Sequence, residues 1–151
     1  MVMDYRLLVP GPVPGLMVAE QPGGFLAELT ASAEAFSAVR ALARWVASAY
    51  GIDAVLGESA ELVLSELTGN VVRSSVGDEP VPLIVEVYAV PRGVEVVVHD
   101  ALPGRPHRRS VALDSAEETS GRGVHLLDLL TERWTVESSP LGKKTRCLLT
   151  E

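Results

Sequence analysis

Two polar residues interrupt an otherwise apolar segment that has the spacing of a helix. Glu66 and Asn70 lie four residues apart within Ala60–Arg73, so a helix there would place both side chains on one face, one turn apart. Asparagine is a poor helix former because its amide competes for backbone hydrogen bonds. A carboxylate beside a carboxamide forms an oxygen-rich surface that suits a magnesium ion and a water molecule. The pair is therefore the first candidate for chemistry in this chain.

Two further segments could contribute to the same chemistry. Asp100 ends a very apolar predicted strand, and the Gly-Arg-Gly segment at 121–123 is predicted to open a helix. An aspartate at a strand end can accept a hydrogen bond from the exocyclic amine of adenine. A glycine pair at a helix start lets the backbone approach an anion, and a helix N-terminus favours phosphate. In such a site Glu66 could activate a water or hydroxyl, and Asn70 could hold magnesium through its oxygen.

Each of these residues also has an ordinary structural interpretation. Glu66 could be a solvated helix carboxylate, Asn70 a late helix position near a C-cap, and Asp100 a turn residue. Glycine pairs are common in loops, and an arginine between them is most often solvated. The occurrence of all three segments in this order favours the functional interpretation over the structural one.

Composition and charge limit the classes of protein that the chain can belong to. With 151 residues, of which 47% are hydrophobic, the chain suits one domain with a sizeable core. A net charge of -7 without a basic stripe argues against a nucleic-acid partner. Cys147 is the only cysteine, which excludes an intramolecular disulfide. Neither an export signal nor an apolar run long enough to span a membrane is visible, so we expect a cytoplasmic protein with no membrane partner.

The pattern along the chain predicts an α+β fold. Residues 1–24 are rich in proline and glycine and are predicted to form an extended arm, in which 16–19 could pair as an edge strand. Residues 25–151 are predicted to form the domain. Its predicted elements are a strand at 25–29, helices at 33–50 and 53–74, strands at 83–89 and 94–99, a loop at 101–120, a helix at 123–131, and strands at 134–137 and 144–149. Hairpins with helices grouped between them predict a two-layer sandwich, and so long a loop indicates a function such as a lid.

Together the motifs resemble those of the Bergerat-fold ATPases, the superfamily of gyrase, Hsp90, the histidine kinases and MutL. Residues 65–70 (Ser-Glu-Leu-Thr-Gly-Asn) resemble its N box, Asp100 its G1 box, and 121–126 (Gly-Arg-Gly-Val-His-Leu) its G2 box. The closing strands follow the family pattern at Trp134, Gly142, Lys143 and Thr145. Within the superfamily the chain looks most like the stand-alone anti-sigma-factor serine kinases of actinobacteria. The resemblance covers about residues 25 to 150.

The resemblance implies a fold, two ligands and a set of site residues. The fold would be a two-layer α/β sandwich with a mixed, mostly antiparallel sheet and helices on one face. ATP would bind with Mg²⁺ between the long helix and a lid, with Asn70 as magnesium ligand and Glu66 as general base. Asp100 would bind the adenine amine. The other implied contacts are Gly121, Arg122 and Gly123 along the phosphates and Thr145 beside the water network of Asp100.

The same resemblance implies a function in transcription regulation. The protein would transfer the γ-phosphate of ATP to a serine of an anti-sigma-factor antagonist, bind a sigma factor in its other partnered state, and form a homodimer. Three positions depart from the family pattern: Leu102 replaces a small residue, Gly69 precedes the asparagine, and Ser74 stands where a histidine is usual. The alternative is therefore a non-catalytic interaction module with weak or no nucleotide binding. A detached histidine-kinase half is disfavoured because no phosphoacceptor helix pair is present.

Overall fold

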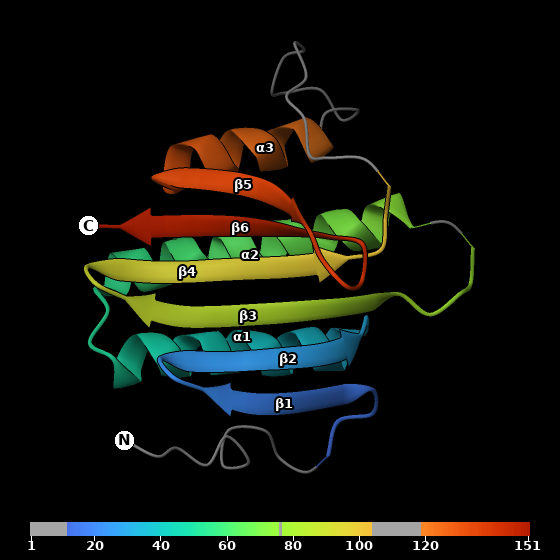
Figure 1. Cartoon of the computed structure of the whole chain (residues 1–151), viewed down its shortest axis with the longest axis horizontal. Helices are drawn as coiled ribbons and strands as arrows, with labels where there is room; N and C mark the ends of the chain where they lie inside the picture. The colour runs from blue at the N-terminus through green and yellow to red at the C-terminus, as the bar shows by residue number, and fades with distance from the viewer. Residues whose placement is uncertain (1–11, 76, 104–118) are drawn as a thin grey trace.

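The computed structural model describes residues 12–75, 77–103 and 119–151, which form a six-stranded sheet with helices packed against it (Figure 1). In chain order the elements are β1 (Leu16–Gln21), β2 (Gly24–Thr30), α1 (Ala33–Ala49), α2 (Ala54–Ser74), β3 (Pro82–Val90), β4 (Gly93–Asp100), α3 (Thr119–Leu130), β5 (Arg133–Ser138) and β6 (Lys143–Thr150). The strand order across the sheet is β1-β2-β3-β4-β6-β5. The predicted α+β fold class is confirmed.

Every pair of neighbouring strands in the described sheet is antiparallel, where the resemblance implied a mixed, mostly antiparallel sheet. The reason lies in the connections. The α1–α2 helix pair joins β2 to β3, and β3 runs antiparallel to β2. The last strand, β6, inserts between β4 and β5. Figure 1 shows α1 and α2 behind the sheet, with α3 beside β5. The sheet therefore has one helix-covered face and one open face.

Local sequence explains where the two long helices begin. The side chain of Ser32 accepts a hydrogen bond from the backbone N–H of Ala35, which caps α1. Asp53 caps α2 in the same way by accepting from the N–H groups of Val55 and Leu56. Between the helices the backbone at Gly51 has φ 64°, a conformation that glycine adopts without strain.

The core lies between the helices and the covered face of the sheet. Strand side chains alternate between the two faces, so every second residue of the central strands is apolar and buried. The fully buried strand residues include Val85, Val87, Val96, Val98, Cys147 and Leu149. They pack against buried residues of α1 and α2, among them Val39, Leu42, Val46, Val63 and Leu64. None of the helices in the described ranges has the length and apolar character needed to cross a membrane.

The ends of two predicted segments differ from the structure. The sheet begins at Leu16 inside the predicted arm, and β1 pairs along its whole length with β2. Helix α3 begins at Thr119, four residues before the predicted start at Gly123. The prediction began the helix too late because apolar residues at helical spacing occur only from Val124 onward. The remainder of the predicted arm, residues 1–11, and most of the predicted lid, residues 104–118, lie outside the described part of the chain.

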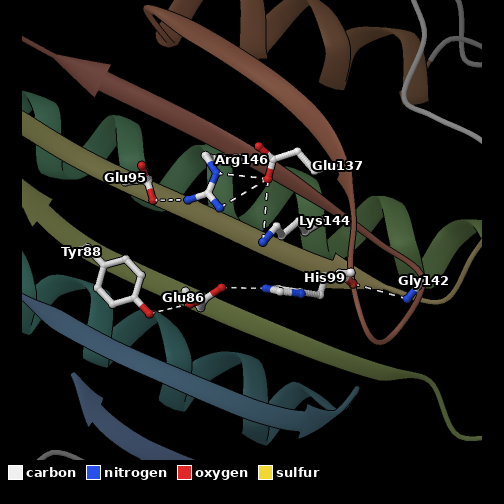
Figure 2. A network of polar contacts seen from close by, with 9 residues as sticks. Glu86, Tyr88, Glu95, His99, Glu137, Gly142, Lys144 and Arg146 are labelled. Carbon is white, nitrogen blue, oxygen red and sulfur yellow. Dashed lines mark hydrogen bonds and ion pairs between the residues drawn. The ribbon is translucent and has the colours of Figure 1, made fainter. Parts of the chain in front are cut away.

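The open face of the sheet carries polar side chains that pair with one another (Figure 2). Glu86 on β3 accepts a hydrogen bond from the Tyr88 hydroxyl at 2.5 Å and lies 2.6 Å from Nε2 of His99 on β4. Burial by itself would raise the pKa of Glu86, but the contacts with Tyr88 and His99 lower it below its usual value. The pKa of Tyr88 is raised, mainly by burial and to a smaller extent by the hydrogen bond to Glu86. Nε2 of His99 therefore has a structural partner on the neighbouring strand.

A second group on the open face is centred on Arg146 of β6. Its guanidinium lies 2.6 Å from Glu95 on β4 and 3.4 Å from Glu137 on β5, so it joins three neighbouring strands. Lys144 lies 3.8 Å from the same Glu137 carboxylate. Burial would lower the pKa of Arg146, but these two carboxylates raise it. The charges of this face are therefore largely paired within the sheet, away from the helix-covered side.

The Cys147 thiol offers a test of the packing. Cys147 has no solvent-exposed surface, and burial raises the pKa of its thiol to about 12. We expect no reaction with a disulfide reagent such as DTNB in the native protein and full labelling in denaturant. Because the pKa is raised on folding, stability should fall as the pH rises from the unfolded thiol pKa of 9.0 toward about 12. Native labelling at the rate of free cysteine would contradict the placement of β6.

Candidate functional site

Helix α2 places Glu66 and Asn70 together, as the sequence predicted, on a face that is not fully covered. The helix packs on β4 and β6 and contacts α1 and α3 on either side. Oε2 of Glu66 and Oδ1 of Asn70 are both enclosed, yet neither has a hydrogen-bond partner among the described residues. The nearby Thr68, also buried, donates to the backbone oxygen of Leu64 at 2.9 Å. Within the described residues, the buried hydroxyl of Thr68 therefore has a hydrogen bond, whereas Oε2 of Glu66 and Oδ1 of Asn70 have none.

Unpaired buried oxygens cost free energy, so proteins keep few of them. A carboxamide oxygen and a carboxylate oxygen one helical turn apart are hard donors of the type that Mg²⁺ prefers. Magnesium also retains several waters and takes only one or two protein ligands at nucleotide sites. The oxygens of Asn70 and Glu66 therefore fit a magnesium ion, bound directly or through water.

Gly69 has a local role that the sequence did not reveal. A side chain at this position would begin 3.0 Å from Nη1 of Arg73, one turn further along α2. The glycine therefore leaves room for the arginine to lie back along the helix, where its Nη2 is 3.5 Å from Oε2 of Glu66. At this distance the pair attract each other without a hydrogen bond, which is consistent with the unpaired state of that oxygen.

Asp100 lies at the end of β4 on the helix-covered face, and only 4% of its surface is exposed. Its Oδ1 accepts a hydrogen bond from the backbone N–H of Leu102 at 2.9 Å and lies 3.2 Å from Nζ of Lys143. Lys143 is directly opposite Asp100 in the β4–β6 register. The carboxylate is therefore both enclosed and paired with a cation.

Thr145 lies on the same face of the sheet as Asp100. It is opposite Val98, two residues before Asp100, and only 3% of its surface is exposed. The strand pairing therefore brings Asp100 and Thr145 to diagonal positions on adjacent strands, within reach of a shared water.

The turn between β5 and β6 sits directly against the end of β4. A side chain at Gly142 would begin 2.8 Å from the carbonyl oxygen of Asp100 and 3.1 Å from Cα of Ala101. Only glycine fits so close to another backbone segment. Leu102 follows this contact and packs partly buried against the hydrophobic core. Leu102 thus forms part of the wall next to Asp100.

The role of Lys143 as a partner of Asp100 is not predicted from the sequence, where the residue is only part of the pattern in the closing strands. A signal was available, because Lys143 precedes Thr145 by two residues and the alternation of a strand puts both on one face. What the sequence could not provide was the register that sets Lys143 opposite Asp100.

The glycine segment lies at the beginning of α3. Gly121, Arg122 and Gly123 follow Thr119, the first residue of that helix, and α3 packs against α2. The glycine segment is thus on a helix that packs against the one carrying Glu66 and Asn70, and a helix start can favour phosphate. The side chains of 119–124 are outside the described part of the structure, so the predicted role of Arg122 stays a prediction.

Comparison with known protein families assigns the fold. The family model described as the histidine kinase-like ATPase domain matches residues 29–148. This span covers most of the chain and all the site residues named above, and the chain belongs to that family. No curated protein matches the chain. The superfamily resemblance predicted from the sequence is confirmed, and the domain is of an ATP-binding type.

The two glycines of α2 provide a matched test of the local packing. In Gly69→Ala only the flexible end of Arg73 must move, so we expect the free energy of unfolding to rise by up to about 1 kcal/mol from helix propensity. In Gly57→Ala the new methyl would begin 3.2 Å from Cβ of Ala47 on α1, so the two helices must shift and the gain should be lost. Urea unfolding measures both. A larger loss in Gly69→Ala than in Gly57→Ala would contradict this geometry.

Proposed function

We propose that this protein is an ATP-binding anti-sigma factor with serine kinase activity toward an anti-sigma-factor antagonist. Membership of the histidine kinase-like ATPase family supports the nucleotide part of the proposal. The observation that carries it furthest is that the enclosed Oε2 of Glu66 and Oδ1 of Asn70 have no hydrogen-bond partner among the described residues. A degenerate scaffold would have no need to keep two such costly atoms next to each other.

The proposed chemistry assigns one role to each residue of α2. Asn70 would hold Mg²⁺ through Oδ1, and the ion, when bound, would supply charge neutralisation at the phosphates. Glu66 accepts the proton of the substrate serine as its hydroxyl oxygen attacks the γ-phosphorus and the bond to the β-phosphate oxygen breaks. Arg73, 3.5 Å from Glu66, limits the orientations of that carboxylate. The glycines at 121 and 123 let the backbone at the start of α3 approach the phosphates, with Arg122 beside them.

The base subsite lies at the end of β4. Asp100 accepts a hydrogen bond from the nucleobase, and Thr145 on the adjacent strand holds a water between them. Enclosure strengthens such a contact because water competes less for the carboxylate.

The partners follow from the same proposal. A sigma factor and an antagonist of the anti-sigma factor are the protein partners, and both act in the cytoplasm. The domain works as a homodimer, and its net charge of -7 argues against binding nucleic acid directly.

One observation favours the second candidate, a non-catalytic interaction module on the same fold. Oδ1 of Asp100 already receives two donors, from Leu102 and Lys143, and Leu102 packs beside it. If these contacts exclude a base, the domain would act through its surfaces alone.

Calorimetric titration with ATP and magnesium separates the two candidates. We expect the wild-type protein to bind, and Asp100→Asn to weaken binding by about 10- to 100-fold through loss of a charged hydrogen bond. Asn70→Ala should weaken the magnesium-dependent part of the binding only. Absence of binding by the wild-type protein would favour the interaction module.

Phosphotransfer from radiolabelled ATP to a candidate antagonist tests the kinase step. Glu66→Gln should keep nucleotide binding and reduce phosphoserine formation by about 10²- to 10⁴-fold. The matched control is Glu61→Gln on the same helix, where the carboxylate pairs with Arg44 and its loss should leave transfer unchanged. Nucleotide binding without any transfer would contradict the kinase assignment.

A further inference from the structure

The Asp100–Lys143 pair is more enclosed than an ordinary surface ion pair. The side chains of Lys143 and Asp100 are exposed to only 16% and 6%. Lys143 also donates to the backbone oxygen of Leu102 at 3.0 Å, so its ammonium is held by two acceptors. A buried cation fixed in this way is part of the subsite wall and not a mobile surface lysine.

The strand geometry keeps this lysine in place. Lys143 is the first residue of β6 and lies opposite Asp100, directly after the Gly142 contact with the backbone of Asp100. The next residue, Lys144, points to the open face toward Glu137. Figure 2 shows Lys144 on that side with Arg146 and Glu137, so it cannot replace Lys143 at the base subsite.

Counting hydrogen-bonding groups shows what the pair can offer to a ligand. An ammonium has three N–H donors, and two of them are directed at Asp100 and Leu102. Both described contacts of the Asp100 carboxylate fall on Oδ1. The wall of the subsite therefore combines a donor with an acceptor, whereas a lone aspartate is an acceptor only.

We propose that Lys143 is a specificity-determining residue that allows the base subsite to accept 6-oxo purines in addition to 6-amino purines. The inference rests on the proposed function, in which Asp100 contacts the nucleobase. A 6-amino purine offers a donor at its amine and an acceptor at N1, while a 6-oxo purine offers an acceptor at O6 and a donor at N1. A lone carboxylate would repel O6. With Lys143 beside it, the ammonium donates to O6 and Asp100 accepts from N1–H.

Comparison of ATP with ITP tests this directly, because the two nucleotides differ only at the 6-position and the N1 proton. We expect the affinities of the wild-type protein for ATP and ITP to agree within about tenfold, since the hydrogen-bonding edge of each base meets a complementary donor and acceptor. In Lys143→Met the affinity for ITP should fall about 10- to 100-fold relative to that for ATP. The matched control Lys144→Met should leave the ratio of the two affinities unchanged.

A second variant and a stability measurement keep the test decisive. Lys143→Met leaves the Asp100 carboxylate without its cation, so its thermal unfolding midpoint should fall. Lys143→Gln retains an amide donor and should keep ITP binding closer to that of the wild type.

Three outcomes would overturn the inference. Equal loss of ATP and ITP in Lys143→Met would show a purely structural role. Binding of ATP with rejection of ITP by more than about 100-fold in the wild type would overturn the inference and leave the proposed function intact. Failure of the wild type to bind either nucleotide would overturn both.

Discussion

The antiparallel pairing of β4 with β6 determines the geometry on which the candidate site depends. Its register sets Asp100 opposite Lys143 and Val98 opposite Thr145, all on the helix-covered face. A slip of β6 by one residue against β4 would turn Lys143 and Thr145 to the open face and bring Lys144 to the covered one, opposite the end of β4. The register is held by core residues on one face, by Arg146 bridging to Glu95 on the other, and by the close backbone contact at Gly142.

Polar groups lie on both sides of the sheet. On the open face the Glu86 carboxylate contacts Tyr88 on its own strand and His99 on β4, and the Glu137 carboxylate pairs with Arg146 on the neighbouring strand β6. On the helix side, Oε2 of Glu66 and Oδ1 of Asn70 on α2 have no hydrogen-bond partner among the described residues, although Arg73 lies 3.5 Å from the Glu66 oxygen. On the open face, Nδ1 of His99 is likewise enclosed without such a partner. The support for the proposed magnesium site is therefore the pairing of a carboxylate with a carboxamide oxygen on one helix face, and not the missing hydrogen bonds alone.

Periodicity and turn residues were enough to predict most of the elements. The helix caps at Ser32 and Asp53 and the hairpin of β3 and β4 follow from local sequence, because their signals are short-range. The motif positions Glu66, Asn70 and Asp100 were likewise found from residue type and spacing. The edge strand expected at 16–19 is present as β1, Leu16–Gln21. The purely antiparallel sheet and the Asp100–Lys143 pair depend on strand order and register. These are set by contacts between distant segments and leave no local signal.

A crystal structure of the protein with magnesium and a non-hydrolysable ATP analogue is the most direct test of whether α2 and the end of β4 form one nucleotide site. We predict a magnesium ion at about 2.1 Å from Oδ1 of Asn70 or joined to it through one water. The base should lie within hydrogen-bond distance of Asp100, with Lys143 at its edge. A nucleotide bound elsewhere, or a base seated without contact to Asp100, would contradict the assignment.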